Sequence, residues 1–268
     1  MSKGDLGGKY VMTRTNILYV MGFAGSGKTT LVTNFSRYLS RQGYNTAVIN
    51  LDPGVELLPY TPEFDVREIV SLREVMRKEN LGPNGGLIRS VEYIVKNKER
   101  VIEKIVSISQ NVDWLLVDTT GQLELFAFRP LGDIIVRAFM DYPSVGLLLV
   151  DITNIQRPSD IVMAQLICMA IQLKLSIDTI IAINKIDLAN AEAKKMIEMF
   201  YVNPEEFRNI MMEQHTDTFS GMSIDLLDTI RNYMPPARIV LISAKNGEGF
   251  DELYDIIHEV FCTCGDLT

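Results

Sequence analysis

The sequence predicts an α/β protein with a doubly wound, mostly parallel sheet. Short apolar runs recur along the chain with helical stretches between them, and this alternation is typical of βαβ units. The runs are apolar at nearly every position, which indicates strands that helices cover on both faces. The six runs are residues 16–21, 46–51, 114–117, 146–150, 179–183 and 238–242.

Length and composition predict one folded domain over residues 1–268. Hydrophobic residues make up 47% of the chain and charged residues 22%, which is ordinary usage for a globular protein, so disorder is not expected. A formal net charge of −8 argues against a broad surface for nucleic-acid phosphates, which would need clustered Lys and Arg. We therefore expect no direct nucleic-acid partner.

The lack of a secretory signal pattern and the cysteine usage predict a cytoplasmic location. The N-terminal sequence MSKGDLGGKYVMTRTN lacks the apolar core and cleavage site of a secretory signal. The most apolar stretch, residues 161–175, contains Gln165, Gln172 and Lys174 and is shorter than the ~20 residues that a membrane-spanning helix needs. Three cysteines do not make a disulfide framework. We expect a soluble protein without a membrane partner.

Two segments interrupt the alternation of strands and helices. Residues 53–110 begin with Pro, Gly and charged residues and predict an insertion at the ligand-binding edge of the sheet. Residues 189–233 predict a second, Met-rich helical insertion. Residues 161–175 are apolar nearly all round, which indicates either deep burial or a groove for a partner. From Phe250 onward, apolar residues at spacings of three and four predict a C-terminal helix that packs on the sheet.

The sequence GFAGSGKT, residues 22–29, matches a P-loop, because a strand precedes it and a helical stretch follows it. Its glycines allow a tight loop whose backbone N–H groups point at phosphate oxygens, next to the positive end of the helix. We expect Lys28 to neutralise the terminal phosphates and the Thr29 hydroxyl to bind Mg²⁺. The expected phosphate-binding residues are Gly25, Ser26, Gly27, Lys28, Thr29 and Thr30.

A second phosphate-side motif, DTTGQ, begins where the third apolar run ends. Asp118 is expected to hold the magnesium shell, and the backbone N–H of Gly121 can approach a γ-phosphate because no Cβ blocks it. The Gln122 amide is placed to orient an attacking water. An ordinary turn at a strand end is the alternative interpretation of this motif.

Two motifs in the C-terminal half indicate recognition of guanine. NKID follows the fifth apolar run, and SAK follows the sixth. The Asp187 carboxylate can accept hydrogen bonds from guanine N1–H and the exocyclic amine, a pair of donors that adenine does not present. The Lys185 stem can lie along the base, the Ala244 N–H suits guanine O6, and Asn184 should tie the two loops together. The expected base-site residues are Asn184, Lys185, Asp187, Ser243, Ala244 and Lys245.

The order of these motifs, together with LDPG at residues 51–54 and GPN at residues 82–84, resembles the GPN-loop GTPases, P-loop proteins of the SIMIBI class. The resemblance covers nearly the whole chain from residue 16. It implies a protein that binds GTP or GDP with Mg²⁺, hydrolyses GTP to GDP and phosphate, and works as an archaeal-type homodimer and nucleotide-dependent switch. It also implies a protein client, because eukaryotic relatives are linked to RNA polymerase assembly.

Phosphoryl transfer to water is the expected reaction, in which positioning and charge stabilisation do most of the work. The expected catalytic residues are Lys28, Asp52, Asn84 and Gln122, and the expected metal-binding residues are Thr29, Asp52 and Asp118. By resemblance, Asn84 reaches the nucleotide of the partner subunit, whereas on composition alone its loop is an ordinary surface turn. By the same resemblance, Asp52 lies near Mg²⁺ and the attacking water, with a turn or helix-capping role as the alternative.

Three features depart from the simplest interpretation. The family usually has proline where this chain has Thr120, which predicts a looser loop before nucleotide binds. SIMIBI proteins often carry a lysine at the position of Phe23, and no arginine stands at an evident finger position, so Arg67 and Arg89 are unassigned. The pair Cys262 and Cys264 supports an alternative function as a metallochaperone-type switch, since a dimer could offer four thiols.

Overall fold

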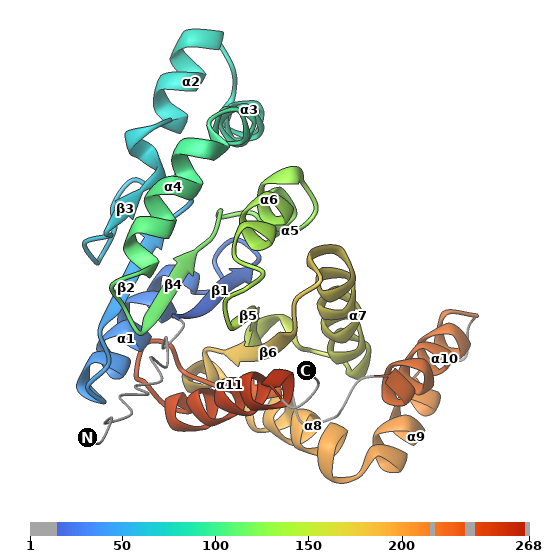
Figure 1. The fold of residues 1–268 in the computed structure, drawn as a ribbon. Helices are drawn as coiled ribbons and strands as arrows, with labels where there is room; N and C mark the ends of the chain where they lie inside the picture. The colour runs from blue at the N-terminus through green and yellow to red at the C-terminus, as the bar shows by residue number, and fades with distance from the viewer. Residues whose placement is uncertain (1–14, 215–217, 234–238, 266–268) are drawn as a thin grey trace, which may run out of the picture.

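The computed structural model describes residues 15–214, 218–233 and 239–265. Its strands form one sheet in the order β3-β2-β4-β1-β5-β6-β7, and all neighbouring strands are parallel. Helices lie on both sides of this sheet (Figure 1), which confirms the predicted fold class. The strands are β1 (Asn16–Gly22), β2 (Thr46–Asn50), β3 (Phe64–Asp65), β4 (Trp114–Asp118), β5 (Ser144–Asp151), β6 (Thr179–Asn184) and β7 (Ile239–Leu241).

Six of these strands correspond to the six predicted apolar runs, and β3 is an addition. It pairs with β2 through two residues, Phe64 and Asp65, which is too short to give a pattern in the sequence. The α-helices are α1 (Lys28–Arg41), α2 (Leu72–Glu79), α3 (Pro83–Lys96), α4 (Lys98–Ser109), α5 (Leu123–Ala127), α6 (Pro130–Ala138), α7 (Pro158–Leu175), α8 (Ala191–Val202), α9 (Pro204–Gln214), α10 (Thr218–Tyr233) and α11 (Phe250–Gly265). Short 3₁₀ turns are η1 (Val66–Glu68), η2 (Ile152–Asn154) and η3 (Ile186–Leu188).

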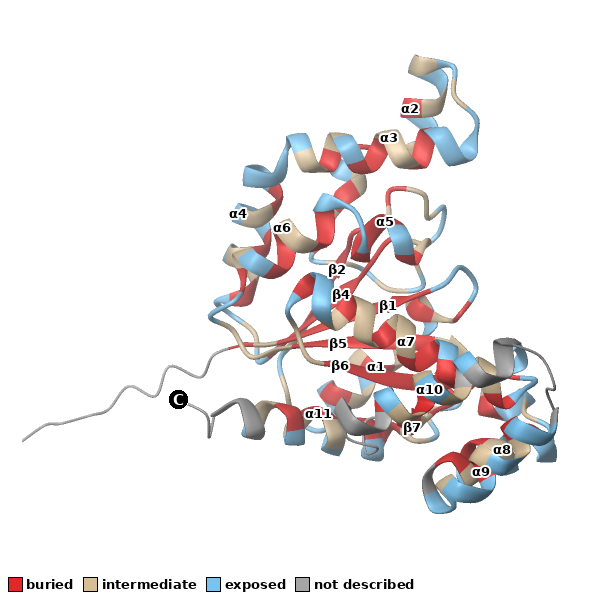
Figure 2. Cartoon of the chain, turned by 90° about the vertical axis from the view of Figure 1, so that its right-hand side faces the viewer, coloured by how far each residue is buried: buried red, intermediate tan, exposed pale blue. Residues whose placement is uncertain are grey.

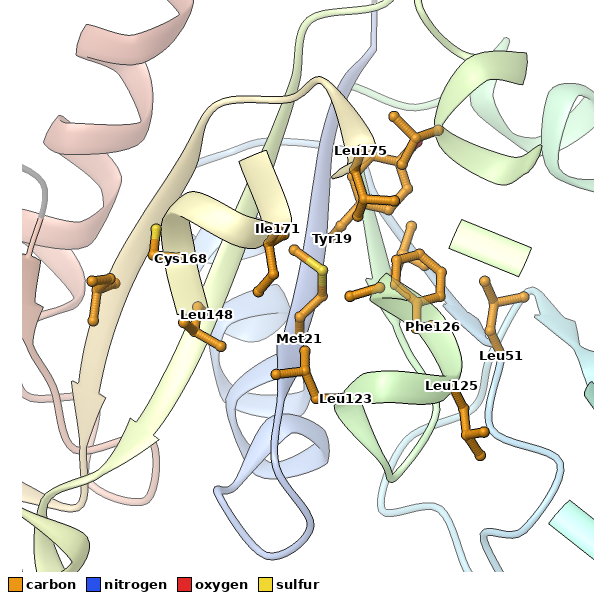
Figure 3. Close-up of a cluster of buried hydrophobic side chains, with 14 of the residues drawn as sticks. Tyr19, Met21, Leu51, Leu123, Leu125, Phe126, Leu148, Cys168, Ile171 and Leu175 are labelled. Carbon is orange, nitrogen blue, oxygen red and sulfur yellow. The ribbon is translucent and has the colours of Figure 1, made fainter. Parts of the chain in front are cut away.

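The sheet separates two apolar cores, and this explains why its strands are apolar at nearly every position. Successive side chains of a strand point to opposite faces. In β1, Leu18 and Val20 face the core that α1 and α11 cover, whereas Tyr19 and Met21 face the core under α5 and α7. Figure 3 shows the second core, where side chains of β1, β5, α5 and α7 meet. Figure 2 shows the buried strands between the exposed outer surfaces of the helices.

The parallel register brings chemically informative residues to one edge. In β4, Asp118 pairs with Val20 of β1 on one side and with Asn50 of β2 on the other. On the far side of β1, Asp151 at the end of β5 pairs with Asn184 at the end of β6. The loops that follow these strands therefore meet at the carboxyl edge of the sheet, where ligands of open α/β folds bind.

The first insertion forms β3, η1 and the helices α2 to α4. In Figure 1, α2 and the start of α3 project beyond the sheet, while α4 lies back beside β2 and β4. The α2–α3 pair is tightly packed, since a Cβ added at Gly86 would lie 2.5 Å from Met76 Cγ. Helices α8 to α10 occupy most of the second insertion and lie together below α7 (Figure 1).

Helix α7 is the helix predicted to be either deeply buried or open to a partner. It is the one described helix whose length and composition would suit a membrane span. In the fold it packs on the sheet, and Cys168 and Ile171 are fully buried in the core of Figure 3. Met163 and Leu173 remain exposed, at 54% and 81%. The helix thus has a core side and a narrow exposed apolar side.

The two sides of α7 predict different costs of truncation. Ile171→Ala should lower the free energy of unfolding by about 2–5 kcal/mol, because it leaves a cavity in a packed core. Leu173→Ala, the matched change on the exposed side, should alter it by no more than about 0.5 kcal/mol. Urea unfolding of the nucleotide-free protein measures both values. A cost for Leu173→Ala as large as that for Ile171→Ala would mean that a partner copy covers this side.

Candidate functional site

The loop between β1 and α1 has the backbone that a phosphate cradle requires. Gly27 has a left-handed φ of 99°, and a Cβ there would lie 2.4 Å from Asn184 Nδ2. Helix α1 begins at Lys28 without a side-chain cap, so the N–H groups of its first turn have no partner within the helix. These groups and the helix dipole make the loop a site for anions.

Lys28 is held at the centre of this loop. Its ammonium donates hydrogen bonds to the carbonyls of Gly22 at 2.8 Å, Phe23 at 3.0 Å and Gly121 at 3.1 Å. Burial lowers the pKa of Lys28, against the raising effect of Asp118 and Asp52. The Lys28 ammonium therefore joins the P-loop to the loop after β4, and an arriving phosphate would take the place of the carbonyls.

Asp118 ends β4 as a buried carboxylate with two different oxygens. Oδ2 accepts a hydrogen bond of 2.8 Å from the Tyr60 hydroxyl, whereas Oδ1 is buried and has no hydrogen-bond partner of good geometry among the described residues. Burial raises the pKa of Asp118 to about 6, against the lowering effects of the Tyr60 and Thr29 hydroxyls and of Lys28. A free carboxylate oxygen beside a threonine hydroxyl suits Mg²⁺, which prefers oxygen ligands.

Asp52 makes the turn contact that was its alternative role, and it also lies beside the loop after β4. Its Oδ1 accepts the Gly54 N–H at 2.8 Å, which is a turn role. Its Oδ2 faces the loop after β4, where a Cβ added at Gly121 would lie 3.0 Å away. Burial raises the pKa of Asp52, while the N–H groups of Gly54 and Gly121 and the Lys28 ammonium lower it. The carboxylate thus lies beside the N–H that the sequence analysis assigned to a γ-phosphate.

Side-chain hydrogen bonds of two threonines hold the motif after β4. Thr120 is fully buried, and its hydroxyl donates to the Gln122 carbonyl at 2.9 Å. The Thr119 hydroxyl donates to the Val20 carbonyl at 2.8 Å. The hydroxyl of Thr120 therefore closes the turn that a proline would stiffen, and Gln122 follows it as the residue that precedes α5.

The residues expected at the base lie together at the carboxyl ends of β6 and β7. Asn184 ties two loops, since its Nδ2 donates to the Ser26 carbonyl at 2.8 Å and its Oδ1 accepts the Ala244 N–H at 2.9 Å. The Ser243 hydroxyl donates to Asp187 Oδ1 at 2.6 Å and orients that carboxylate. Because the Ala244 N–H already donates to Asn184, guanine O6 would have to share this N–H or displace Asn184.

Several positioning residues were missed by the sequence analysis. The Lys185 ammonium donates to Asp151 Oδ2 at 2.5 Å, which fixes the lysine whose backbone has an unusual φ of 67°. Arg67 donates to both oxygens of Asp65, and also to the carbonyls of Val55 at 3.0 Å and Glu56 at 3.2 Å. Arg67 therefore holds the loop after β2 in place. No motif marks such pairs, because most of their partners are backbone carbonyls or distant in sequence.

Asn84 makes no side-chain hydrogen bond within the described part of the chain. It is exposed in the first turn of α3, and the preceding Pro83 lines a pocket together with Pro53 and Gly54 of the loop after β2. Of the other expected residues, Thr30 and Lys245 are exposed. Cys262 is exposed, and the Cys264 side chain lies outside the described residues. The described residues contain no group of three or more His, Cys, Asp or Glu side chains that could hold a metal.

Comparisons with known proteins agree on one family. A family model described as a conserved hypothetical ATP binding protein matches residues 20–263. The chain is 35% identical to the GPN-loop GTPase PAB0955 of Pyrococcus abyssi, over 94% of this chain and 100% of that protein. It is 31% identical to GPN-loop GTPase 1 of Dictyostelium discoideum, but spans only 60% of that longer protein. The crystal structure of PAB0955 in its apo form superposes with a TM-score of 0.84 at 33% identity, covering 93% of this chain and 98% of that one.

The contact between Ser243 and Asp187 generates a prediction on base selectivity. In Asp187→Asn the Ser243 hydroxyl keeps an acceptor, but guanine loses a carboxylate partner. GTP affinity should fall by about 10- to 150-fold, as expected for about 1.5–3 kcal/mol of charge-assisted hydrogen bonding. Xanthosine triphosphate should bind the variant better than the wild type. Competition binding with GTP, ATP and xanthosine triphosphate measures this, and equal affinity of the wild type for ATP and GTP would contradict it.

Burial of Asp118 predicts a pH-dependent stability. Its folded pKa of about 6 lies above the value near 3.9 of an unfolded aspartate, so the folded state loses stability as the pH rises from about 4 to about 6, and the loss is complete above that range. Asp118→Asn cannot ionise and should escape this loss. Its unfolding free energy relative to wild type should increase by about 1–2 kcal/mol between about pH 4.5 and about pH 7.5 in nucleotide-free protein. Urea unfolding at both values tests the sign, and a constant difference would contradict it.

Proposed function

Because the chain belongs to the GPN-loop GTPases, we propose that two copies of it form a homodimer in which each subunit completes the other's site for GTP hydrolysis. The chain is a GTP hydrolase, as its relatives are. The dimer, the site residues and the coupling to a client are our proposals. Two observations carry these proposals. Lys28, Asp52 and Asp118 gather at the edge of the sheet, whereas Asn84 is exposed at the start of α3 in the α2–α3 pair.

Within one subunit, the gathered residues support phosphoryl transfer to water. Lys28 and the N–H groups of the P-loop stabilise the phosphates. Thr29 and Asp118 would hold Mg²⁺, which supplies neutralising charge at the phosphates when bound. Asp52 and Gln122 are the groups that orient the attacking water. Base selection lies at the other end of the P-loop, where Asp187 is oriented by Ser243.

The start of α3 is built to present donors to another molecule. Gly82 precedes the helix without a side-chain cap, and Pro83 occupies its first turn. The Gly86 N–H bonds to the Gly82 carbonyl at 2.8 Å, but the N–H groups of Asn84 and Gly85 precede the first intrahelical bond and face outward with the positive end of the helix dipole. A partner nucleotide that met this turn would find both the Asn84 amide and these N–H groups.

The two unassigned arginines support a role for Asn84 across the dimer. Arg67 is taken up by Asp65 and by the loop carbonyls after β2. Arg89 of α3 pairs with Glu79 of α2 at 2.9 Å and with Glu92 of α3 at 2.7 Å. Both guanidiniums therefore have structural partners in their own chain, which leaves the Asn84 end of α3 as the candidate for charge stabilisation in trans.

We also propose that the nucleotide state is passed to a protein client, as in complex assembly. A cavity of about 290 Å³ lies directly behind the P-loop, where Phe23 and Ser26 meet Met163 and Ile167 of α7. It therefore joins the phosphate cradle to the exposed side of α7. Capture of partners by the protein loaded with GDP or with a non-hydrolysable GTP analogue tests the idea, and identical partners in both states would contradict it.

The shared site predicts complementation between two inactive variants. Lys28→Ala and Asn84→Ala should each lose most GTP turnover. In a mixed dimer, the Lys28→Ala chain supplies its intact Asn84 to the working P-loop of the other chain. With random exchange about half of the dimers are mixed and one of their two sites works, so roughly a quarter of wild-type turnover should return. Steady-state GTPase assays of chains refolded together measure it, and verified mixed dimers without activity would exclude donation in trans.

Gly85→Ala provides a matched variant that leaves the fold intact. A Cβ at Gly85 would come no closer than 3.7 Å to Leu81 Cδ2, whereas one at Gly86 would clash with Met76. Gly85→Ala should therefore keep stability and GTP affinity but lower turnover at least about tenfold, because the added methyl group would hold the partner nucleotide away from the donors of this turn. Unchanged turnover would place the partner nucleotide away from this turn.

A further inference from the structure

Tyr60 makes a contact at the site that none of the recognised motifs includes. It lies on the loop between β2 and β3, and its hydroxyl donates to Asp118 Oδ2 at 2.8 Å across 58 residues of sequence. Its half-buried ring packs against the core on the α1 and α11 side of the sheet. We propose that Tyr60 is a positioning residue that orients the Asp118 carboxylate for Mg²⁺, an inference that rests on the proposed role of Asp118.

The two oxygens of the Asp118 carboxylate have different surroundings. Tyr60 occupies Oδ2, and Oδ1 is left as a buried oxygen without a hydrogen-bond partner of good geometry among the described residues. A buried carboxylate oxygen that lacks a well-aligned donor is costly in the protein alone, and a cation held between it and the Thr29 hydroxyl would offset that cost. A donor on Oδ2 fixes the carboxylate plane, and this turns Oδ1 into a preoriented acceptor for a cation or its water.

The loop that carries Tyr60 is attached near both of its ends. Near its start, the Val55 and Glu56 carbonyls accept from Arg67, and at its end Glu63 Oε2 accepts the Val48 N–H at 2.6 Å. These contacts bind the loop to β2 and η1, and the Tyr60 hydroxyl ties it to Asp118. Because Asp52 lies on the same loop, Tyr60 connects the carboxylate near Gly121 with the carboxylate at the metal position.

Residues that orient a metal-binding group do not contact the ion themselves, but their substitution usually lowers metal affinity. Tyr60→Phe keeps the ring in the core and deletes only the hydroxyl. Mg²⁺ is expected to slow the release of GDP. In Tyr60→Phe the free Mg²⁺ concentration at which this slowing is half complete should be about tenfold higher than in wild type. The affinity for GDP in excess EDTA should stay within about twofold of wild type, since Tyr60 is not among the residues expected to bind the phosphates or the base.

Tyr44→Phe is the matched control. Tyr44 also packs at the edge of the same core, and its hydroxyl pairs with the Tyr254 hydroxyl at 2.5 Å, away from the carboxyl edge. Both variants thus lose one tyrosine hydroxyl bond that borders the same core. Tyr44→Phe should leave the Mg²⁺ dependence at the wild-type value.

The experiment follows the release of a fluorescent N-methylanthraniloyl GDP at increasing free Mg²⁺, for wild type, Tyr60→Phe, Tyr44→Phe and Asp118→Asn. A rightward shift in Tyr60→Phe alone among the two tyrosine variants supports the proposal. A wild-type curve for Tyr60→Phe overturns it, and so does an equal loss of GDP affinity in EDTA, which would make Tyr60 a part of the pocket wall. Tighter Mg²⁺ binding would also overturn it and would make the hydroxyl a block.

Asp118→Asn separates this proposal from the one on which it rests. If Asp118→Asn weakens the Mg²⁺ effect and Tyr60→Phe does not, the metal role of Asp118 stands and the role of Tyr60 is overturned. If Asp118→Asn leaves the Mg²⁺ effect unchanged, the metal role of Asp118 fails and the positioning role fails with it.

Discussion

The parallel register of the sheet is the constraint on which the site depends. Asn50, Asp118, Asp151 and Asn184 each end a strand, and parallel pairing aligns those ends along one edge. Segments that lie far apart in the chain are thereby placed within hydrogen-bonding distance, as when Asn184 reaches the Ser26 carbonyl across 158 residues. A shift of one residue in any pairing would turn these side chains to the other face. The chemistry is therefore as well defined as the packing of the two cores.

Buried charge distinguishes the phosphate end of the site from its base end. Around the P-loop, burial lowers the pKa of Lys28 and raises those of Asp52 and Asp118. These shifts show groups whose charged forms are poorly solvated in the free protein. At the base end, Asp187 is held by a serine hydroxyl and Lys185 by a carboxylate. The phosphate end therefore differs from the base end in burying charged groups, whereas direct side-chain hydrogen bonds hold the base end.

The α2–α3 pair is a rigid support for an exposed group. Its own packing is tight at Gly86, and its outer ion pairs fix Arg89, so the exposed turn at Asn84 is held on a stiff support. Stiffness matters for a group that acts on another molecule, because the cost of ordering it is met during folding rather than at each encounter. This is the physical reason to look for the function of Asn84 across a subunit interface.

The sequence by itself determined the fold class and the positions of the loops, because continuous apolar runs and the motifs that follow them are local signals. It located Lys28 and Asp187 for the same reason, since glycine spacing and a strand end suffice to mark them. Only the tertiary structure decided which groups hold the side chains of the site: the Gly121 carbonyl on Lys28, Ser243 on Asp187, and Tyr60 on Asp118. It also decided that the Thr120 hydroxyl bonds to the Gln122 carbonyl. Such bonds join single side chains to distant residues or to backbone atoms, and neither leaves a periodic trace in the sequence.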